Sequence, residues 1–280
     1  MEINSCFFKL NNDDIANTST ILEYIIEYLQ KRKGIEGYGE AVSYSTRPWV
    51  LVFCSDMDSI ESTIAQALAN KHHDLNLQSN KRWLEGIRLC VVKSLDELKA
   101  MLSCIHLTPP SSTVTATTSA MEANNKKNNI EEDDHDLLTW IIKEKQGQPP
   151  SMVVVINLLE LLLTYGPDGN ISHENKYLYI RFDELAGILA MLTETCVYFS
   201  TSARETWEQP FDISTKTGTD LLITDNGCLR DITELQQQQE KGQEQQQQQG
   251  SKSSFSSSYE ELDVLEKLHR IITYYLGNIV

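Results

Sequence analysis

Two aspartates directly follow an apolar run in LVFCSDMDSI, with the spacing Asp-x-Asp. Asp56 and Asp58 would stand at the end of a strand, where one carboxylate can attack phosphorus and both can hold magnesium. Thr201, Lys216 and Asp225 follow in the order that a magnesium-dependent phosphatase with an aspartate nucleophile would use. The glycine and threonine expected after the second acid are absent, however. We therefore favour a simpler interpretation, in which Asp56 or Asp58 caps the next helix.

The next candidate lies in an apolar run, MVVVINLLELLL (152–163), which is broken only by Asn157 and Glu160. Its Val- and Ile-rich first half predicts a strand at 152–157 that is buried on both faces of a parallel sheet. In α/β proteins that hydrolyse nucleotides, such a strand ends in an acid that positions magnesium or water. Asn157 is neutral, so we assign Asn157 and Glu160 only local hydrogen-bonding roles.

A phosphate-binding loop is missing from the sequence. A P-loop requires G-x-x-x-x-G-K-[ST], in which backbone N–H groups surround the phosphates and the lysine neutralises their charge. No such string occurs in the chain. The Gly-rich stretch IEGYGE carries Glu36 and Glu40, whose charge opposes phosphate binding, and we interpret it as a loop. We expect neither ATP hydrolysis nor a bound cofactor.

The histidines and cysteines do not have the spacing of a metal site. The sequence contains no H-E-x-x-H, no C-x-x-C and no Cys/His cluster. Cys54, Cys90 and Cys196 lie in apolar, strand-like runs, which suits buried thiols in a reducing compartment. The start of the chain does not read as a signal peptide, and no apolar run reaches the ~20 residues that span a bilayer. We expect a soluble, intracellular protein without a metal site.

Positive charge is sparse in this chain, whose formal net charge is −16. That balance argues against a surface that binds nucleic acid or acidic membrane as a whole, because phosphate binding depends on Lys and Arg. Arg204, Lys216 and Arg230 carry more weight than the other cations, because they follow late predicted strands, where open α/β sheets place their ligand loops. These three residues are our candidate nucleic-acid contacts.

Strands and helices alternate along the predicted pattern. We predict strands at 3–10, 49–54, 87–92, 152–157, 196–200 and 221–225. We predict helices from Asp13 or Asp14 through Leu29, at 59–70, from Ser94 onward, at 136–145, at 181–194 and at 259–279. Ser94 and Glu97 have the spacing of a capping box. This alternation predicts an α/β fold with a mostly parallel sheet and helices on both sides.

Two segments have the composition of solvated insertions rather than of core. Residues 107–135 are rich in Thr, Asn and acids, and residues 235–258 are rich in Gln and Ser, so neither can bury enough apolar surface to order itself. Because predicted strands lie on both sides of the first insertion, we treat 1–280 as a single domain. The C-terminal segment 259–280 has an apolar face that its own sheet or another chain must cover.

The ordered series of segments resembles a known family. WVLVFCSDMDS, IRLCVVKSLDELKAML, SMVVVINLLELLL with the loop GNISHENK, and the closing LEKLHRIITYYL are similar to the chromosome-segregation-in-meiosis subunit of the yeast Shu complex. That family is a degenerate paralogue of the RecA-type recombinases. The resemblance covers most of the predicted elements, and RLCVVKSLDEL and VVVINLLELL carry it most specifically.

The resemblance implies a RecA-like domain without working nucleotide motifs, and therefore not an enzyme. It implies a nuclear protein, with the cytoplasm as a second location, that forms an obligate heterodimer with another degenerate paralogue. With further Shu-complex subunits, that dimer assists recombinase loading on DNA during homologous recombination, meiosis and error-free repair. The family's basic DNA-contacting segment corresponds to about 231–258, which here holds only Lys241 and Lys252, so we expect DNA contact through the complex. An ATPase-inactive RecA-like subunit of the Elongator tRNA-modification complex is the alternative, because ELLL at 160–163 resembles that group.

Overall fold

The chain was analysed as a computed structural model, which describes residues 5–10, 14–35, 47–58, 60–62, 83–107, 137–163, 180–205, 218–226, 255–277 and 279. The strands are β1 (Ser5–Leu10), β2 (Val50–Cys54), β3 (Ile87–Val91), β4 (Met152–Val155) and β5 (Asp220–Asn226). The named helices are α1 (Asp14–Ile35), α4 (Leu95–Leu107), α5 (Leu137–Lys145), α6 (Leu158–Leu161), α7 (Phe182–Glu205) and α9 (Phe255–Leu276).

The five strands form one sheet in the order β1-β5-β4-β2-β3, and every pairing is parallel. The predicted α/β fold with a parallel sheet flanked by helices is therefore confirmed. The central strands β2 and β4 are buried along their whole length. Such uninterrupted apolar strands are what a parallel sheet requires when helices cover both of its faces.

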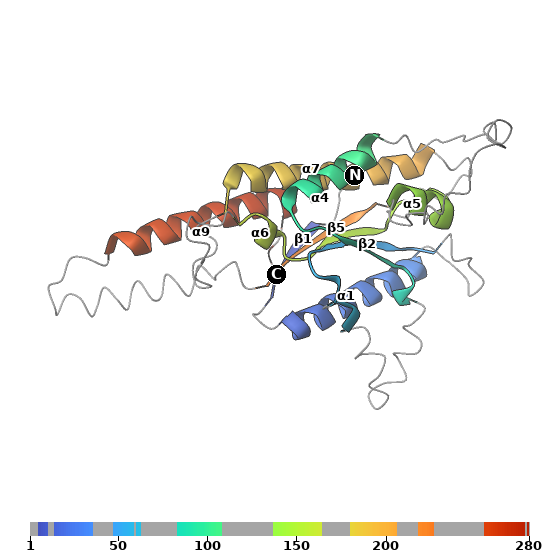
Figure 1. Cartoon of the computed structure of the whole chain (residues 1–280), viewed down its shortest axis with the longest axis horizontal. Helices are drawn as coiled ribbons and strands as arrows, with labels where there is room; N and C mark the ends of the chain where they lie inside the picture. Colours follow the sequence, from blue (N-terminus) through green and yellow to red (C-terminus); the bar gives the residue numbers. More distant parts are fainter. Residues whose placement is uncertain are drawn as a thin grey trace, which may run out of the picture.

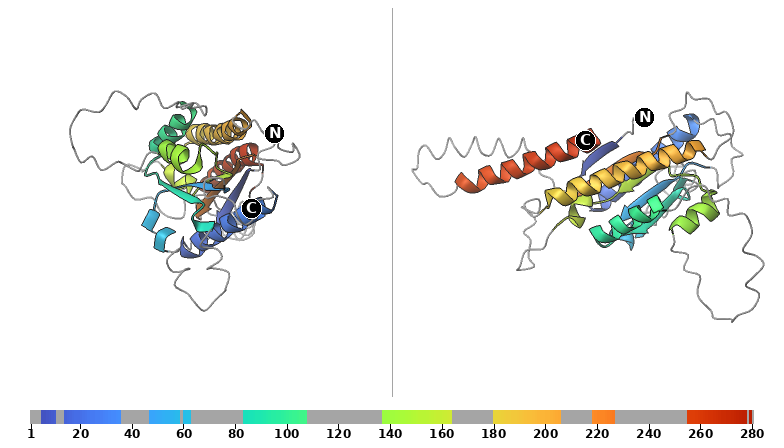
Figure 2. Two further views of the ribbon diagram at one scale, coloured as in Figure 1. Left: turned by 90° about the vertical axis from the view of Figure 1, so that its right-hand side faces the viewer. Right: turned by 90° about the horizontal axis from the view of Figure 1, so that it is seen from above.

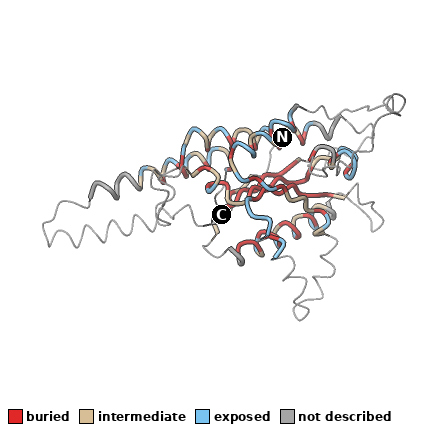
Figure 3. The backbone as a smooth tube through the Cα atoms, viewed as in Figure 1, coloured by how far each residue is buried: buried red, intermediate tan, exposed pale blue. Residues whose placement is uncertain are grey.

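Helices cover the two faces of the sheet unequally (Figures 1 and 2). On one face α1 packs through Ile21, Ile25 and Leu29 against alternate strand residues such as Val52 and Val154. The other face carries the larger core, to which α4, α5, α6, α7 and α9 contribute. Figure 3 shows buried residues concentrated in the sheet and on the helix faces that point toward it.

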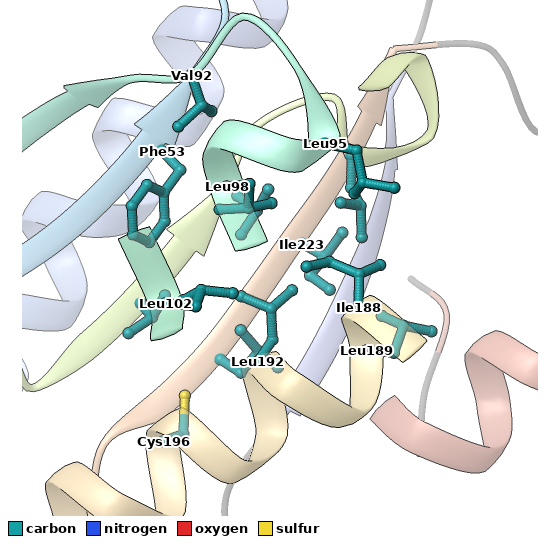
Figure 4. Close-up of a cluster of buried hydrophobic side chains, with 14 of the residues drawn as sticks. Phe53, Val92, Leu95, Leu98, Leu102, Ile188, Leu189, Leu192, Cys196 and Ile223 are labelled. Carbon is teal, nitrogen blue, oxygen red and sulfur yellow. The ribbon is translucent and has the colours of Figure 1, made fainter. Parts of the chain in front are cut away.

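The larger core joins α4 and α7 to the sheet. Figure 4 shows Leu98 and Leu102 of α4 meeting Leu192 of α7, with Phe53 and Ile223 contributed by the strands. Each of these side chains is at most 1% exposed. Burying one such side chain stabilises the fold by about 1.5–3 kcal/mol, so this layer fixes both helices on the sheet.

One predicted strand is wrong. Residues 196–200, CVYFS, belong to α7, which also continues well past the predicted end at 194. The buried positions Leu185, Ile188, Leu192 and Cys196 keep the three- and four-residue spacing of a helix. The β-branched and aromatic residues that favoured a strand simply continue that apolar stripe. Cys196 is therefore a buried helical thiol rather than part of a strand.

The C-terminal helix is covered by its own chain. Leu265, Leu268, Ile272 and Leu276 are at most 1% exposed, and α9 packs along α7 and beside β1. After α9, Ile279 forms a parallel bridge with Phe7 of β1. The helix begins at Phe255, which is earlier than the predicted residue 259. Most of the two predicted insertions, 107–135 and 235–258, lies outside the described residues. None of the helices that the structure describes is long and apolar enough to cross a membrane.

Candidate functional site: the two edges of the sheet

All strands end at one edge of a parallel sheet, which we call the carboxyl edge, and ligands of open α/β folds bind there. From β2 the chain passes outward to β3, whereas from β4 it passes the other way to β5. The ends of β2 and β4 therefore flank the point where the connections diverge. Asp56 follows β2 and Asn157 follows β4, so these two residues occupy the classical ligand position of the fold class.

The Asp-x-Asp pair after β2 occupies a helix start. Asp56 and Asp58 are exposed, and Asp56 directly precedes the helical residues 57 and 58. This is the N-cap position, where an aspartate side chain suits the free N–H groups of the first turn. A helix-capping role accounts for the pair without any bound metal.

Asn157 shapes the chain where β4 ends. Its backbone has φ 57° and ψ 44°, a left-handed conformation that asparagine tolerates better than most residues. Its N–H donates to Thr224 Oγ1 at 3.3 Å, and its own Oδ1 is buried without a hydrogen-bond partner. The strand stops at Val155, short of the predicted residue 157, because this left-handed residue turns the chain straight into α6. Glu160 then lies on α6 and is exposed.

The other members of the phosphatase order are not assembled around Asp56. Thr201 lies within α7, where its hydroxyl bonds to the carbonyl oxygens of Val197 and Tyr198 at 3.1 and 2.9 Å. Asp225 is fully buried in β5, and Lys216 lies outside the described residues. Within the described ranges, no group of three His, Cys, Asp or Glu side chains could hold a metal ion.

The strand–loop–helix unit at the start of the chain has no room for a P-loop. Only Asn11, Asn12 and Asp13 separate the end of β1 at Leu10 from the start of α1. The P-loop string is about eight residues long and needs glycines and a lysine, which this connection lacks. A crevice beside α1 near the strand ends offers no cation either. It is lined by Thr18, Ile21, Leu22, Ile25, Val52, Ile60, Leu89 and Ile156.

Carboxylates dominate the carboxyl edge. Helices that follow parallel strands begin there, and the first turns of α4 and α7 are acidic. Acids near helix N-termini are stabilised by the helix dipole. The acids in question are Asp56, Asp58, Asp96, Glu97, Glu160, Asp183, Glu184 and Asp225. Lys9, Lys93, Lys99 and Arg181 also lie on this side, but Lys99 pairs with Glu184 and Arg181 pairs with Asp183 at 3.0 Å. The edge therefore repels phosphate.

The opposite edge, where the strands begin, has the reverse charge and is rich in aromatic residues. Trp140 of α5 lies edge-on to Trp49 with ring centroids 5.1 Å apart. The Arg88 guanidinium is 5.0 Å from the centroid of the Trp140 ring, and Lys145 Nζ is 5.9 Å from it. Arg47, next to the start of β2, reaches Glu85 at 4.0 Å. Figure 1 places α5 at the right-hand end of the molecule, far from α6.

Lys145 is the most unusual cation at this amino edge. It is fully buried at the end of α5, a position that favours positive charge because helix C-terminal carbonyls point outward. Burial, together with the smaller effect of the neighbouring Arg47 charge, nevertheless lowers the pKa of Lys145 to about 8, although Glu144 acts in the opposite direction. Keeping Lys145 protonated therefore costs free energy, and other positive charges lie near it.

A further cation, Arg32, lies at the amino edge on the α1 side. Arg32 donates to the carbonyl of Gly218, just before β5, and its guanidinium lies 5.9 Å from the Tyr28 ring centroid. The Tyr28 hydroxyl bonds to Ser151 O at 2.7 Å and to Asp220 Oδ2 at 2.8 Å. These contacts tie the last turns of α1 to the starts of β4 and β5.

The three candidate nucleic-acid residues are not brought together among the described residues. Arg204 lies in the last turn of α7, at the amino edge, because nearby Ser200 Oγ accepts the N–H of Thr219 at 2.8 Å. That position is opposite to the carboxyl-edge loop we expected. Lys216 and Arg230 lie outside the described residues. Sequence reasoning missed Arg47 and Arg88, which are isolated in sequence and come to the same end of the sheet only through the pairing of β2 with β3.

Comparison with known proteins adds no relative to this picture. No family model matches the chain, and no curated protein matches it.

Proposed function

We propose that this chain is a non-catalytic subunit of a Shu-type recombination-mediator complex, built on a RecA-like domain that has lost nucleotide binding. It acts in the nucleus as one half of a heterodimer with a second degenerate recombinase paralogue. In that assembly it helps a recombinase to load on DNA during homologous recombination and repair.

The observation that carries the proposal is the acidic carboxyl edge. A working RecA-type site needs a phosphate loop and an acid after the central strand, and this chain has Asn157 and a three-residue β1–α1 connection in those places. The parallel sheet is retained, so what remains is a scaffold that presents surfaces to other subunits. The segments that resemble the Shu-complex family form β2, β3, α4, β4 and α9 of that scaffold.

The partner must use a surface other than the apolar face of α9. That face is covered by α7 and β1, so deleting 259–280 would expose core residues rather than remove a docking arm. Among the described residues, the exposed large hydrophobic side chains are Tyr274 of α9, at 82%, and Met57, Val91, Ile142 and Val197, at 38–45%. Val91 ends β3, the outermost described strand on its side of the sheet.

Affinity purification of the tagged full-length chain, followed by mass spectrometry, tests the assembly. Recovery of recombinase paralogues supports the proposal, whereas tRNA-modification subunits would replace it with the Elongator alternative. Isothermal calorimetry with Mg-ATP tests the empty nucleotide site. We expect no saturable heat, and micromolar binding would contradict the loss of nucleotide binding.

A further inference from the structure

The amino edge of the sheet carries a compact surface of cations around one indole. We define the amino-edge patch as Arg47, Arg88, Trp140, Lys143 and Lys145. Arg88 and Lys145 approach the Trp140 ring, and Lys143 lies one turn after Trp140 on α5 and is exposed. Among the described residues next to these positions in sequence, the acids are Glu85 and Glu144, so the described part of the patch keeps a positive balance within a chain of net charge −16.

We propose that the amino-edge patch binds single-stranded nucleic acid, with Arg47 and Lys143 contacting phosphates and Trp140 contacting an unpaired base. The inference deepens the proposed function, on which it rests: it assigns a direct nucleic-acid contact to this chain and places it opposite the usual ligand edge.

Helix electrostatics alone do not explain the patch. Lys143 and Lys145 lie in the last turn of α5, where the helix dipole favours cations. Arg47 precedes β2 and Arg88 lies within β3, so neither belongs to a helix end. Arg47 lies close enough to Lys145 to lower the pKa of that lysine, and Arg88 approaches the same Trp140 ring as Lys145. A bound phosphate would add negative charge beside these cations, next to the ion pair that Arg47 forms with Glu85 at 4.0 Å.

The aromatic content favours single strands over duplex. Unpaired bases expose their rings and can stack on aromatic side chains, whereas duplex bases are already stacked on one another. Trp140 is only partly buried, so some of its side chain reaches the surface, and Arg88 lies over its ring. Trp49 packs edge-on against the Trp140 ring, and the Trp49 Nε1–H donates to the carbonyl of Gln148 at 3.0 Å. Trp49 is thereby fixed and limits the movement of Trp140.

The test uses the full-length chain, a fluorescein-labelled oligothymidylate of about 20 nucleotides and fluorescence anisotropy. The double variant Arg47→Gln/Lys143→Gln removes the two phosphate contacts, and Lys267→Gln/Arg270→Gln on α9 is the matched control. Lys267 and Arg270 are also a lysine and an arginine, 52% and 79% exposed, and each pairs within its own helix. Circular dichroism melts confirm that both variants fold.

We expect the patch variant to bind on the order of tenfold more weakly and the α9 variant to bind as wild type. Loss of two contacts should lower the slope of log K against log salt by about 1.4, since each single-strand phosphate contributes about 0.7. Oligothymidylate should also quench tryptophan emission, and Trp140→Phe should reduce the quench while keeping binding. Equal weakening by both double variants, or an unchanged patch variant, would overturn the inference.

Two further outcomes separate this inference from the proposed function. Absence of oligonucleotide binding by the wild-type chain overturns the patch as a contact, but leaves the assembly to be judged by co-purification. Tighter binding of a duplex of the same length, without tryptophan quenching, overturns the single-strand assignment. Conversely, patch-dependent binding without recombination partners would support the contact and contradict the proposed complex.

Discussion

The two edges of one sheet differ in charge, in aromatic content and in what holds them together. At the carboxyl edge, where Asn157 turns the chain, most of the carboxylates are exposed or stand at helix starts. At the amino edge, Arg88 and Lys145 approach Trp140, and Arg47 lies near Lys145. Parallel α/β topology gathers helix N-termini at the first edge and C-termini at the second, so opposite charges are favoured at the two. The difference teaches that an acidic protein can still concentrate cations at one end.

The charges at the two edges also differ in origin. The amino edge carries charged side chains where topology favours them and adds two arginines that no helix end requires. Among the described residues of the carboxyl edge, the acids stand mainly at helix starts, and Asn157 makes one left-handed turn.

Removing the buried charge from the amino edge has the largest expected effect. Lys145→Met should raise the free energy of unfolding at pH 7 by up to about 3 kcal/mol, because the folded lysine has a pKa of about 8 against 10.5 in a free lysine. Between those values the unfolded chain binds more protons, so wild-type stability should gain from this group as pH rises from about 8 to 10.5. Urea melts across that range measure both effects.

The comparison must be made against wild type at each pH. Burial raises the pKa of Cys54 and of Cys90 to about 11, from 9 in a free thiol, so these two groups oppose the lysine at high pH. They are unchanged in Lys145→Met, and the difference between the two proteins isolates the lysine. If the difference in unfolding free energy between the two proteins stayed constant from pH 7 to 10.5, folding would not shift the pKa of Lys145.

A hydrogen bond at the amino edge gives the next largest effect. Ser200 Oγ accepts the buried N–H of Thr219 and itself donates to Cys196 O at 2.7 Å, which joins α7 to the start of β5. Ser200→Ala should cost about 1–3 kcal/mol, because it leaves that N–H without a partner. Thr201→Ala, one residue along on the exposed side of α7, is the control and should change stability little. Equal losses would mean that α7 is sensitive in general.

The sequence predicted the strands of the sheet but not the amino-edge patch, and both outcomes have physical reasons. The runs at 49–54, 87–92, 152–157 and 221–225 predicted β2, β3, β4 and β5 because fully buried strands leave long apolar signatures. The run at 196–200 misled because a helix buried along one face can carry the same residues. The amino-edge patch comes from three separated segments, each showing one or two cations, and only strand pairing and the packing of α5 bring them together.

The left-handed turn at the carboxyl edge should show a smaller and more diagnostic effect. Asn157→Ala should cost about 1 kcal/mol, since alanine disfavours φ 57°, whereas Asn157→Gly should fall within about 0.5 kcal/mol of wild type. Glycine adopts the same backbone without strain and removes the buried Oδ1 that lacks a partner. Urea unfolding of both variants measures this. If glycine were as costly as alanine, the asparagine side chain would have a role beyond backbone conformation.

The smallest effect is expected at a helix cap of the carboxyl edge. Ser94 Oγ accepts the N–H of Glu97 at 3.2 Å, and the Glu97 carboxylate accepts the N–H of Lys93 at 2.6 Å, so the predicted capping box is present with its return bond shifted by one residue. Ser94→Ala should cost about 0.5–1 kcal/mol, and Ser94→Asp should restore most of it. Thermal melts of the pair distinguish capping from packing. If Ser94→Asp did not restore stability, repulsion between carboxylates at the carboxyl edge would offset the cap. The acidity of this edge would then limit the stability of the fold as well as phosphate binding.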